Sequence, residues 1–164
     1  MRNTALYVGV GLMALFGLSA CEKGPSTLDI QEMCENTVHA YSFARDSGNE
    51  AGLLGIFTED AVLTLFGKDQ TGRAEIVKAA LARAKAQNTR HMITSVNVDV
   101  SNAGPIMGQS YVAIFNGPNA DSAATPIASP EPFALATYND EFELIADKCL
   151  ISKRIVVVDY ITQN

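Results

Sequence analysis

The stretch RAEIVKAALARAKAQNTRHMITSVNVDV, residues 73–100, decides the fold class because its apolar pattern changes period part-way along. In its first half, apolar side chains recur at the three- and four-residue spacing of a helix: Ile76, Val77, Ala80, Leu81 and Ala84. From Arg90 onward the spacing is two, and Met92, Val96 and Val98 alternate with polar neighbours, as is typical of a strand. A helix is therefore expected to lead directly into a strand.

Upstream of this stretch, the sequence predicts two helices and one strand. Residues 26–29, Ser-Thr-Leu-Asp, resemble a capping box, and apolar side chains follow at helical spacing as far as Tyr41. The first helix is therefore expected to run to about Asp46. A short second helix carries its apolar side chains on one face: Leu53, Leu54 and Phe57. A strand over 61–66 and a polar turn over 67–70 are expected next.

Downstream, the sequence predicts three more strands, over about 108–116, 133–145 and 151–161. The segment 117–132 between the first two is rich in Pro, Ala and Ser, and a connection of that length is either functional or mobile. Helices come first, and the last four strands follow one another in antiparallel order. The fold class is therefore α+β, with the helices gathered on one face of a curved sheet.

Composition places the chain among globular proteins and excludes several kinds of site. Of its 164 residues, 48% are apolar and 18% are charged, and the net charge of −6 argues against a nucleic-acid partner. With two histidines and no Cys-x-x-Cys pair, a zinc site has too few ligands, so no metal is expected. The chain also lacks a Gly-x-Ser-x-Gly elbow and a phosphate-binding Gly-x-x-x-x-Gly-Lys loop, and no cofactor is expected.

The first 21 residues resemble a bacterial lipoprotein leader. One basic residue, Arg2, precedes an apolar run that is too short to span a bilayer, and the run ends in Leu18-Ser19-Ala20-Cys21. This ending looks like a lipobox, which implies that Cys21 is acylated and holds the protein on a membrane. Glu22, rather than Asp, after the cysteine implies an outer-membrane location facing the periplasm. The alternative is an ordinary secretory leader that happens to precede a cysteine.

This interpretation divides the chain into three parts: a signal peptide at 1–20, a lipidated tether at 21–27 and one domain at 28–164. Removing the leader takes away one basic residue and no acidic one, so the mature chain carries a formal charge of −7 instead of −6. The remaining chain is long enough to bury a substantial core as one domain.

Several motifs of the domain resemble the SnoaL-like branch of the nuclear transport factor 2-like superfamily, which includes scytalone dehydratase and polyketide cyclases. They are YSFARDSGN at 41–49, FTEDAV at 57–62, GRAEI at 72–76, TRHMIT at 89–94 and ISKRIVV at 151–157. The resemblance covers about residues 28–161. It implies a conical barrel in which a curved, mainly antiparallel sheet wraps around a long N-terminal helix and leaves an apolar pocket for a small hydrophobic molecule. This fold serves many functions, so it does not by itself specify one.

By this resemblance, Asp46 and His91 occupy the positions of the catalytic dyad of dehydratases and dehydrochlorinases. Asp46 would be the base and His91 its relay, in a cofactor-independent lyase or isomerase. The resemblance also implies pocket residues that contact the substrate: Tyr41, Tyr111, Phe115 and Tyr138. The chain departs from the dehydratase pattern in two places. Arg45 replaces a tyrosine, and the position of a second histidine falls near Phe115 or Asn116.

Simpler interpretations of the same residues remain open. Asp46 also suits a solvated turn at a helix end, and His91 alternates with Ile93, Ser95 and Asn97, so it faces away from the more apolar side of its strand unless a bulge intervenes. The alternative function is a non-catalytic lipoprotein that binds a ligand or forms a homodimer through its sheet. In that case we expect an exposed apolar patch: Met92, Val96 and Val98.

Two cysteines remain once Cys21 is acylated. Cys34 and Cys149 are an even pair in an exported protein, so they form either a disulfide or two buried thiols. The family resemblance favours the disulfide, because it implies that Cys149 packs toward the first helix, on which Cys34 lies.

Overall fold

The computed structural model describes residues 24–101, 104–118 and 132–162, which form three helices and one six-stranded sheet. The predicted leader at 1–20 and the predicted lipidation site Cys21 lie outside the described residues, as does most of the segment predicted at 117–132. In chain order the elements are α1 (Thr27–Ser47), α2 (Glu50–Leu54), β1 (Phe57–Leu65), β2 (Lys68–Thr71), α3 (Arg73–Ala86), β3 (Asn88–Asp99), β4 (Ile106–Gly117), β5 (Ala134–Ile145) and β6 (Lys148–Ile161). Within the described ranges, no helix is both long and apolar enough to cross a membrane.

Helix α1 begins at the predicted capping box. The backbone N–H of Ser26 donates to Asp29 Oδ2 at 2.8 Å, and the backbone N–H of Asp29 donates to Ser26 Oγ at 3.2 Å. The side-chain and backbone hydrogen bonds from Ser26 lower the pKa of Asp29. The helix ends at Gly48, whose φ of 64° is the left-handed conformation that glycine adopts without strain. Both ends of this long helix are therefore set by local sequence.

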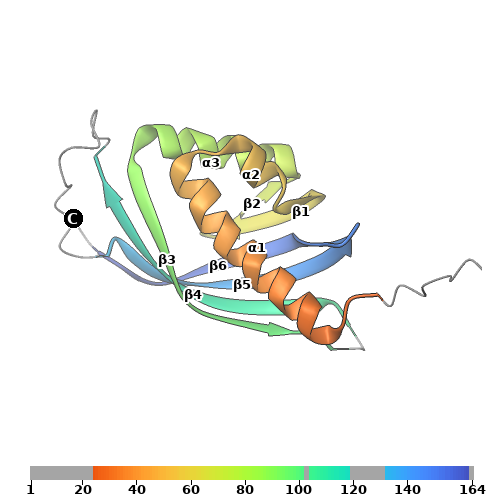
Figure 1. Cartoon of the computed structure of the whole chain (residues 1–164). Coiled ribbons are helices and arrows are strands. Elements are labelled where there is room, and N and C mark those ends of the chain that lie inside the picture. The colour runs from red at the N-terminus through yellow and green to blue at the C-terminus, as the bar shows by residue number, and fades with distance from the viewer. Residues whose placement is uncertain (1–23, 102–103, 119–131, 163–164) are drawn as a thin grey trace, which may run out of the picture.

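The sheet has the strand order β2-β1-β6-β5-β4-β3. The four last strands are antiparallel neighbours, as predicted, whereas β1 pairs with β6 in parallel. The sheet curves strongly, and all three helices lie on its concave side, with α1 crossing the sheet (Figure 1). The α+β cone expected from the sequence is thus confirmed.

Two local predictions are wrong. Phe57 was expected on the second helix, but α2 ends at Leu54 and Phe57 is the first residue of β1, fully buried. The polar residues 67–70 were expected to be only a turn. Instead, the turn is confined to Phe66 and Gly67, which have positive φ, and Lys68–Thr71 pairs with β1 as a short edge strand. A four-residue polar strand has no apolar alternation from which it could be predicted.

The hydrophobic core lies between the helices and the concave face of the sheet. Its most deeply buried apolar members come from every layer: Cys34, Val38, Leu53, Phe57, Ile76, Val112, Phe142 and Ile151. The core fills the narrow part of the cone, and a cavity lies at the other end.

Candidate functional site

A cavity of about 110 Å³ lies between α1, α3 and the concave face of the sheet. This is smaller than the roughly 150 Å³ that hold a benzene ring in an engineered apolar cavity, so a ligand of one ring would fill it. One part of its wall is apolar: Leu63, Leu65, Phe66, Ile76, Ile114, Phe133, Val156 and Val158. The other part is polar: Tyr41, Arg45, Gln70, Arg83, Gln87, Thr89, His91, Asn116 and Tyr138. The cavity therefore suits an amphipathic small molecule.

Asp46 and His91 lie side by side at the polar part of the cavity. The His91 backbone N–H donates to Asp46 Oδ2 at 2.8 Å, and His91 Nδ1 lies 2.5 Å from Asp46 Oδ1. The side chain of His91 is only 7% exposed and that of Asp46 only 9%. Against an ionised carboxylate, Nδ1 must carry the proton, so Nε2 of a neutral His91 keeps a free lone pair. His91 lines the cavity and Asp46 does not, so Asp46 lies behind the imidazole.

A bulge in β3 explains why His91 faces inward. The pairing with β4 shifts between Ile93, opposite Val112, and Ser95, opposite Tyr111, which leaves one extra residue in β3. Before the bulge, Thr89 and His91 line the cavity and Met92 is 56% exposed; after it, Val98 is buried. The expected patch of Met92, Val96 and Val98 therefore does not exist, because the bulge divides the three residues between the two faces of the sheet.

Two tyrosines of the cavity wall, Tyr41 and Tyr138, pack against a buried ion pair. The Arg154 guanidinium lies 4.4 Å from the Tyr41 ring centroid and 4.2 Å from that of Tyr138. Its Nε and Nη2 each donate to one oxygen of Asp140, at 2.7 Å, and both residues are buried. Although burial opposes it, the charge and hydrogen bonds of Asp140 raise the pKa of Arg154. This ion pair is therefore charged and bidentate.

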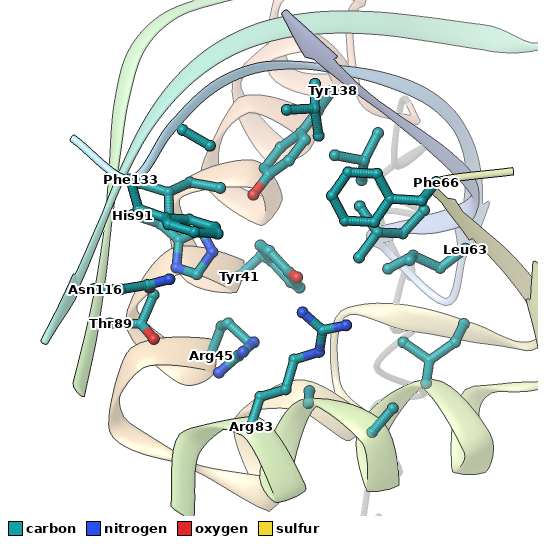
Figure 2. A pocket seen from close by; sticks show the side chains of 18 of the residues that line it. Tyr41, Arg45, Leu63, Phe66, Arg83, Thr89, His91, Asn116, Phe133 and Tyr138 are labelled. Carbon is teal, nitrogen blue, oxygen red and sulfur yellow. The ribbon is translucent and has the colours of Figure 1, made fainter. Parts of the chain in front are cut away.

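Tyr138 presents a neutral phenol to the cavity. Burial, and next the neighbouring Tyr41, hold the pKa of Tyr138 well above its usual range. Figure 2 shows the hydroxyl groups of Tyr41 and Tyr138 pointing into the same space as His91. A phenol that stays protonated is a hydrogen-bond donor for an oxygen of a bound molecule.

The two arginines of the cavity were missed by sequence reasoning as site residues. Arg45 is 6% exposed, and its Nη1 has no hydrogen-bond partner in the part of the chain that the structure describes. Figure 2 shows Arg45 from α1 and Arg83 from α3 pointing into the cavity. A signal for both was present in the sequence. Arg45 lies four residues after Tyr41 and continues the buried stripe of α1, and Arg83 lies three residues after the buried Ala80, at an exposed position that still lines the cavity.

Thr89 and Asn116 are a cross-strand pair in the cavity wall. The Thr89 hydroxyl and Asn116 Oδ1 are both buried, and neither has a hydrogen-bond partner within residues 24–101, 104–118 and 132–162. Asn116 is one of the two residues near which the family resemblance implied a second histidine, and it places a polar group in the wall. Buried polar atoms without partners are rare in native proteins, so these two atoms favour a polar ligand.

The remaining predicted pocket residues divide into two groups. Tyr41 and Tyr138 line the cavity, whereas Tyr111 and Phe115 do not. Tyr111 is 54% exposed and lies after the bulge, opposite Ser95, on the outer face of the sheet. Phe115 pairs with the exposed Arg90, while its neighbours Ile114 and Asn116 alternate into the cavity. The prediction that Tyr111 and Phe115 line the pocket is therefore wrong.

Cys34 on α1 and Cys149 on β6 form a disulfide, with their Cα atoms 5.0 Å apart. Both residues are buried. The cross-link attaches the first helix to the last strand at the narrow part of the core, away from the cavity. Among the described residues, no group of three His, Cys, Asp or Glu side chains is placed to hold a metal ion.

The fold and the cavity together define a class of protein, the cone-shaped α+β domains with a small internal pocket. A sequence model described as a SnoaL-like domain matches residues 26–155, most of the chain. The protein therefore belongs to the SnoaL-like domain family. No curated protein sequence matches it.

Solved structures share this fold at low sequence identity. A hexachlorocyclohexane dehydrochlorinase (LinA) of type 2 is 19% identical with a TM-score of 0.68, over 84% of this chain and 92% of that one. A candidate scytalone dehydratase from Novosphingobium aromaticivorans DSM 12444 is 16% identical with a TM-score of 0.66, over 80% and 85%. A protein of unknown function with a cystatin-like fold from Nostoc punctiforme PCC 73102 is 18% identical with a TM-score of 0.65, over 82% and 93%. At these identities the likeness shows the fold alone.

Proposed function

We propose that this protein is a cofactor-independent lyase or isomerase in which His91 accepts a proton from carbon and Asp46 positions His91. The observation that carries the proposal is the pair of hydrogen bonds from His91 to Asp46, of 2.8 and 2.5 Å, beside a small cavity. The fold is also that of dehydratase and dehydrochlorinase structures.

The proposed step needs only groups of this chain. Nε2 of neutral His91 takes a proton from a carbon next to an electron-withdrawing group, and the electron pair of the C–H bond forms a double bond. In a lyase a leaving group departs with its bonding pair; in an isomerase His91 returns the proton to another carbon. Asp46 stabilises the imidazolium without itself becoming protonated. Tyr138 donates a hydrogen bond to a substrate oxygen and keeps its proton, because its pKa is raised.

These roles reverse the assignment expected from the sequence, in which Asp46 was the base. Both Asp46 oxygens already accept from His91, and the carboxylate does not line the cavity. A group that cannot reach the substrate acts only through its neighbour. We therefore assign Asp46 as a positioning residue.

Deuterium uptake from D₂O tests proton abstraction before any product is known. We would incubate the protein with small cyclic ketones, hydroxy acids and halogenated rings, and follow loss of each C–H signal by NMR. The replacements Asp46→Asn and His91→Gln are expected to slow the exchange by about 100-fold or more. Asp99→Asn is the matched control, because Asp99 lies exposed on the same strand as His91. Wild-type exchange rates in both dyad variants would overturn the proposal.

We also propose that Cys21 anchors the domain to the bacterial cell envelope, on the outer membrane facing the periplasm. The lipobox-like sequence at 18–21 supports this location. Mass spectrometry of the purified N-terminal peptide should find an acylated Cys21, and Cys21→Ala should move the protein from the membrane fraction to the soluble fraction. An unmodified cysteine after cleavage would support the ordinary secretory leader instead.

A second candidate function, a homodimer through the outer face of the sheet, has its own observation. Large apolar side chains lie exposed there, and among them Leu135 pairs directly with Tyr160. The exposed group is Met92, Met107, Tyr111, Leu135, Ile155, Val157 and Tyr160. Sedimentation velocity should then show a dimer that Tyr111→Glu with Val157→Glu converts to a monomer. A wild-type protein that stays monomeric at high concentration would exclude this candidate.

A further inference from the structure

The charges around the cavity are unbalanced. Among the described residues, the two buried carboxylates near the cavity are already used: Asp140 binds Arg154, and Asp46 binds His91. Arg45 and Arg83 form no ion pair with any described carboxylate. Among the described residues, the wall of the cavity therefore includes one buried guanidinium group, Arg45, one exposed guanidinium group, Arg83, and no acidic side chain.

The position of Arg45 makes this imbalance costly. Its side chain is more than nine-tenths buried, it points into the cavity, and Nη1 has no hydrogen-bond partner among the described residues (Figure 2). A buried cation without a counter-charge is unfavourable, and natural proteins keep such groups chiefly where a ligand supplies the opposite charge. Arg83 approaches the same space from α3, so two separate elements direct positive charge at one point.

The ligand that matches this wall carries a fixed negative charge on a planar group. A guanidinium presents parallel N–H donors that suit the two oxygens of a carboxylate. The other part of the wall is apolar, with Leu63, Ile114 and Val156 among its members. The unsatisfied Thr89 hydroxyl can donate to the same anionic group.

We infer that the cavity binds small organic acids, with the carboxylate held by Arg45 and Arg83 and the hydrocarbon part against the apolar wall. This inference names the substrate class of the proposed reaction and, in that sense, rests on it. It also assigns to Arg45 a role that a tyrosine at this position would not fill, since a phenol carries no positive charge.

Binding of three acids and their neutral amides tests the inference without any turnover. The probes are isobutyrate, crotonate and benzoate, none larger than one substituted ring, each compared with its amide by NMR titration of the purified protein at constant ionic strength. We expect at least one acid to bind at least about tenfold more tightly than its amide. Hydrogen bonds between two charged groups contribute more binding free energy than those to a neutral amide, and the difference corresponds to about that factor in affinity. If no acid binds more tightly than its amide, the inference is wrong.

Arginine variants connect the binding to these two residues. Arg83→Gln, at an exposed position of α3, should weaken acid binding about tenfold and leave amide binding unchanged. Lys78→Gln is the matched control, because it removes the same charge from the exposed side of α3. Arg45→Gln should abolish the preference for acids. Equal acid binding by wild type and both arginine variants would overturn the inference.

The Asp46→Asn variant separates this inference from the proposed reaction. Acid binding should survive in that variant, since Asp46 does not line the cavity. If Asp46→Asn and His91→Gln both keep wild-type deuterium exchange, the proposed reaction fails and the acid-binding inference still stands on the titrations. If both variants lose exchange while acids and amides bind equally well to wild type, the acid-binding inference fails and the proposed reaction stands.

Discussion

At the scale of single residues, the interior of this protein holds two kinds of buried cation. Arg154 has a bidentate carboxylate partner and two aromatic rings, although its Nη1 makes no hydrogen bond to the described residues. Arg45 has no acidic partner among the described residues, and its Nη1 makes no hydrogen bond to them either. The charge of Arg154 is therefore balanced by Asp140, whereas the charge of Arg45 is left for a ligand to balance. Removing the partner of Arg154 should destabilise the protein, and removing Arg45 should not.

Asp140→Asn should lower the free energy of unfolding by about 3–5 kcal/mol, because it leaves Arg154 buried without a counter-charge. Arg45→Gln should leave the unliganded protein as stable as wild type or more stable, since it removes a buried charge that has no partner. Urea unfolding followed by circular dichroism measures both changes.

Glu141→Gln is the control for Asp140→Asn. Glu141 is the next residue of β5, and it pairs with Lys153 at 2.9 Å, with side chains 35% and 44% exposed. A surface pair of this kind contributes up to about 1 kcal/mol. Equal losses in the Asp140 and Glu141 variants would contradict the account of the buried pair.

Tyr138 predicts a loss of stability at alkaline pH. Burial raises the pKa of this phenol in the folded protein above its usual 10.0. Above pH 10 the phenol ionises in the unfolded chain before it does so in the folded protein, so the free energy of unfolding is unaffected below pH 10 and falls as the pH rises further. Each pH unit above that value should cost about 1.4 kcal/mol until the folded phenol also ionises. Denaturant midpoints from about pH 9 to about pH 11 should show this slope in wild type and a smaller one in Tyr138→Phe. Identical slopes would show that Tyr138 is not the group responsible.

At the scale of elements, the disulfide joins the first helix to the last strand. Cys34 and Cys149 are 115 residues apart in sequence, so the cross-link closes most of the domain into one loop. Replacing both cysteines by serine should lower the free energy of unfolding by about 4 kcal/mol, mainly by releasing the unfolded chain.

Alkylation and mass spectrometry check the cross-link directly. Unfolded, unreduced protein should bind no alkylating reagent at Cys34 or Cys149, and reduction should add two labels. Two labels before reduction would show free thiols and remove the basis of the stability prediction.

The sequence predicted most of these elements, and the failures have local causes. The helices and long strands carry clear apolar periods, and the capping box of α1 is visible at 26–29. The bulge in β3 is not visible, because its residues Ile93, Thr94 and Ser95 carry no glycine or proline to mark it. A regular strand with Val96 and Val98 facing the core would place Met92 inward and His91 outward, the opposite of what the structure shows. That difference is why the orientation of His91 stayed open until the structure was known.

At the scale of the whole molecule, the fold followed from the order of elements, but the cavity did not. Its wall takes residues from α1, α3 and all six strands of the sheet, and these residues meet only when the sheet curves around the helices. Sequence reasoning placed Asp46, His91, Tyr41 and Tyr138 in or beside the site. It missed Arg45 and Arg83, because a charged residue on an inward stripe is normally assigned to solvent.

The central claim is that Asp46 holds His91 with Nδ1 protonated and Nε2 free toward a ligand. The measurement that tests it most directly is ¹⁵N NMR of the imidazole rings, which is simple because the chain has two histidines and His39→Gln identifies the other signal. The account predicts a neutral His91 with the proton on Nδ1, a changed tautomer balance in Asp46→Asn, and a shift of Nε2 when benzoate is added. A His91 that carries its proton on Nε2, and that responds neither to Asp46→Asn nor to benzoate, would contradict it.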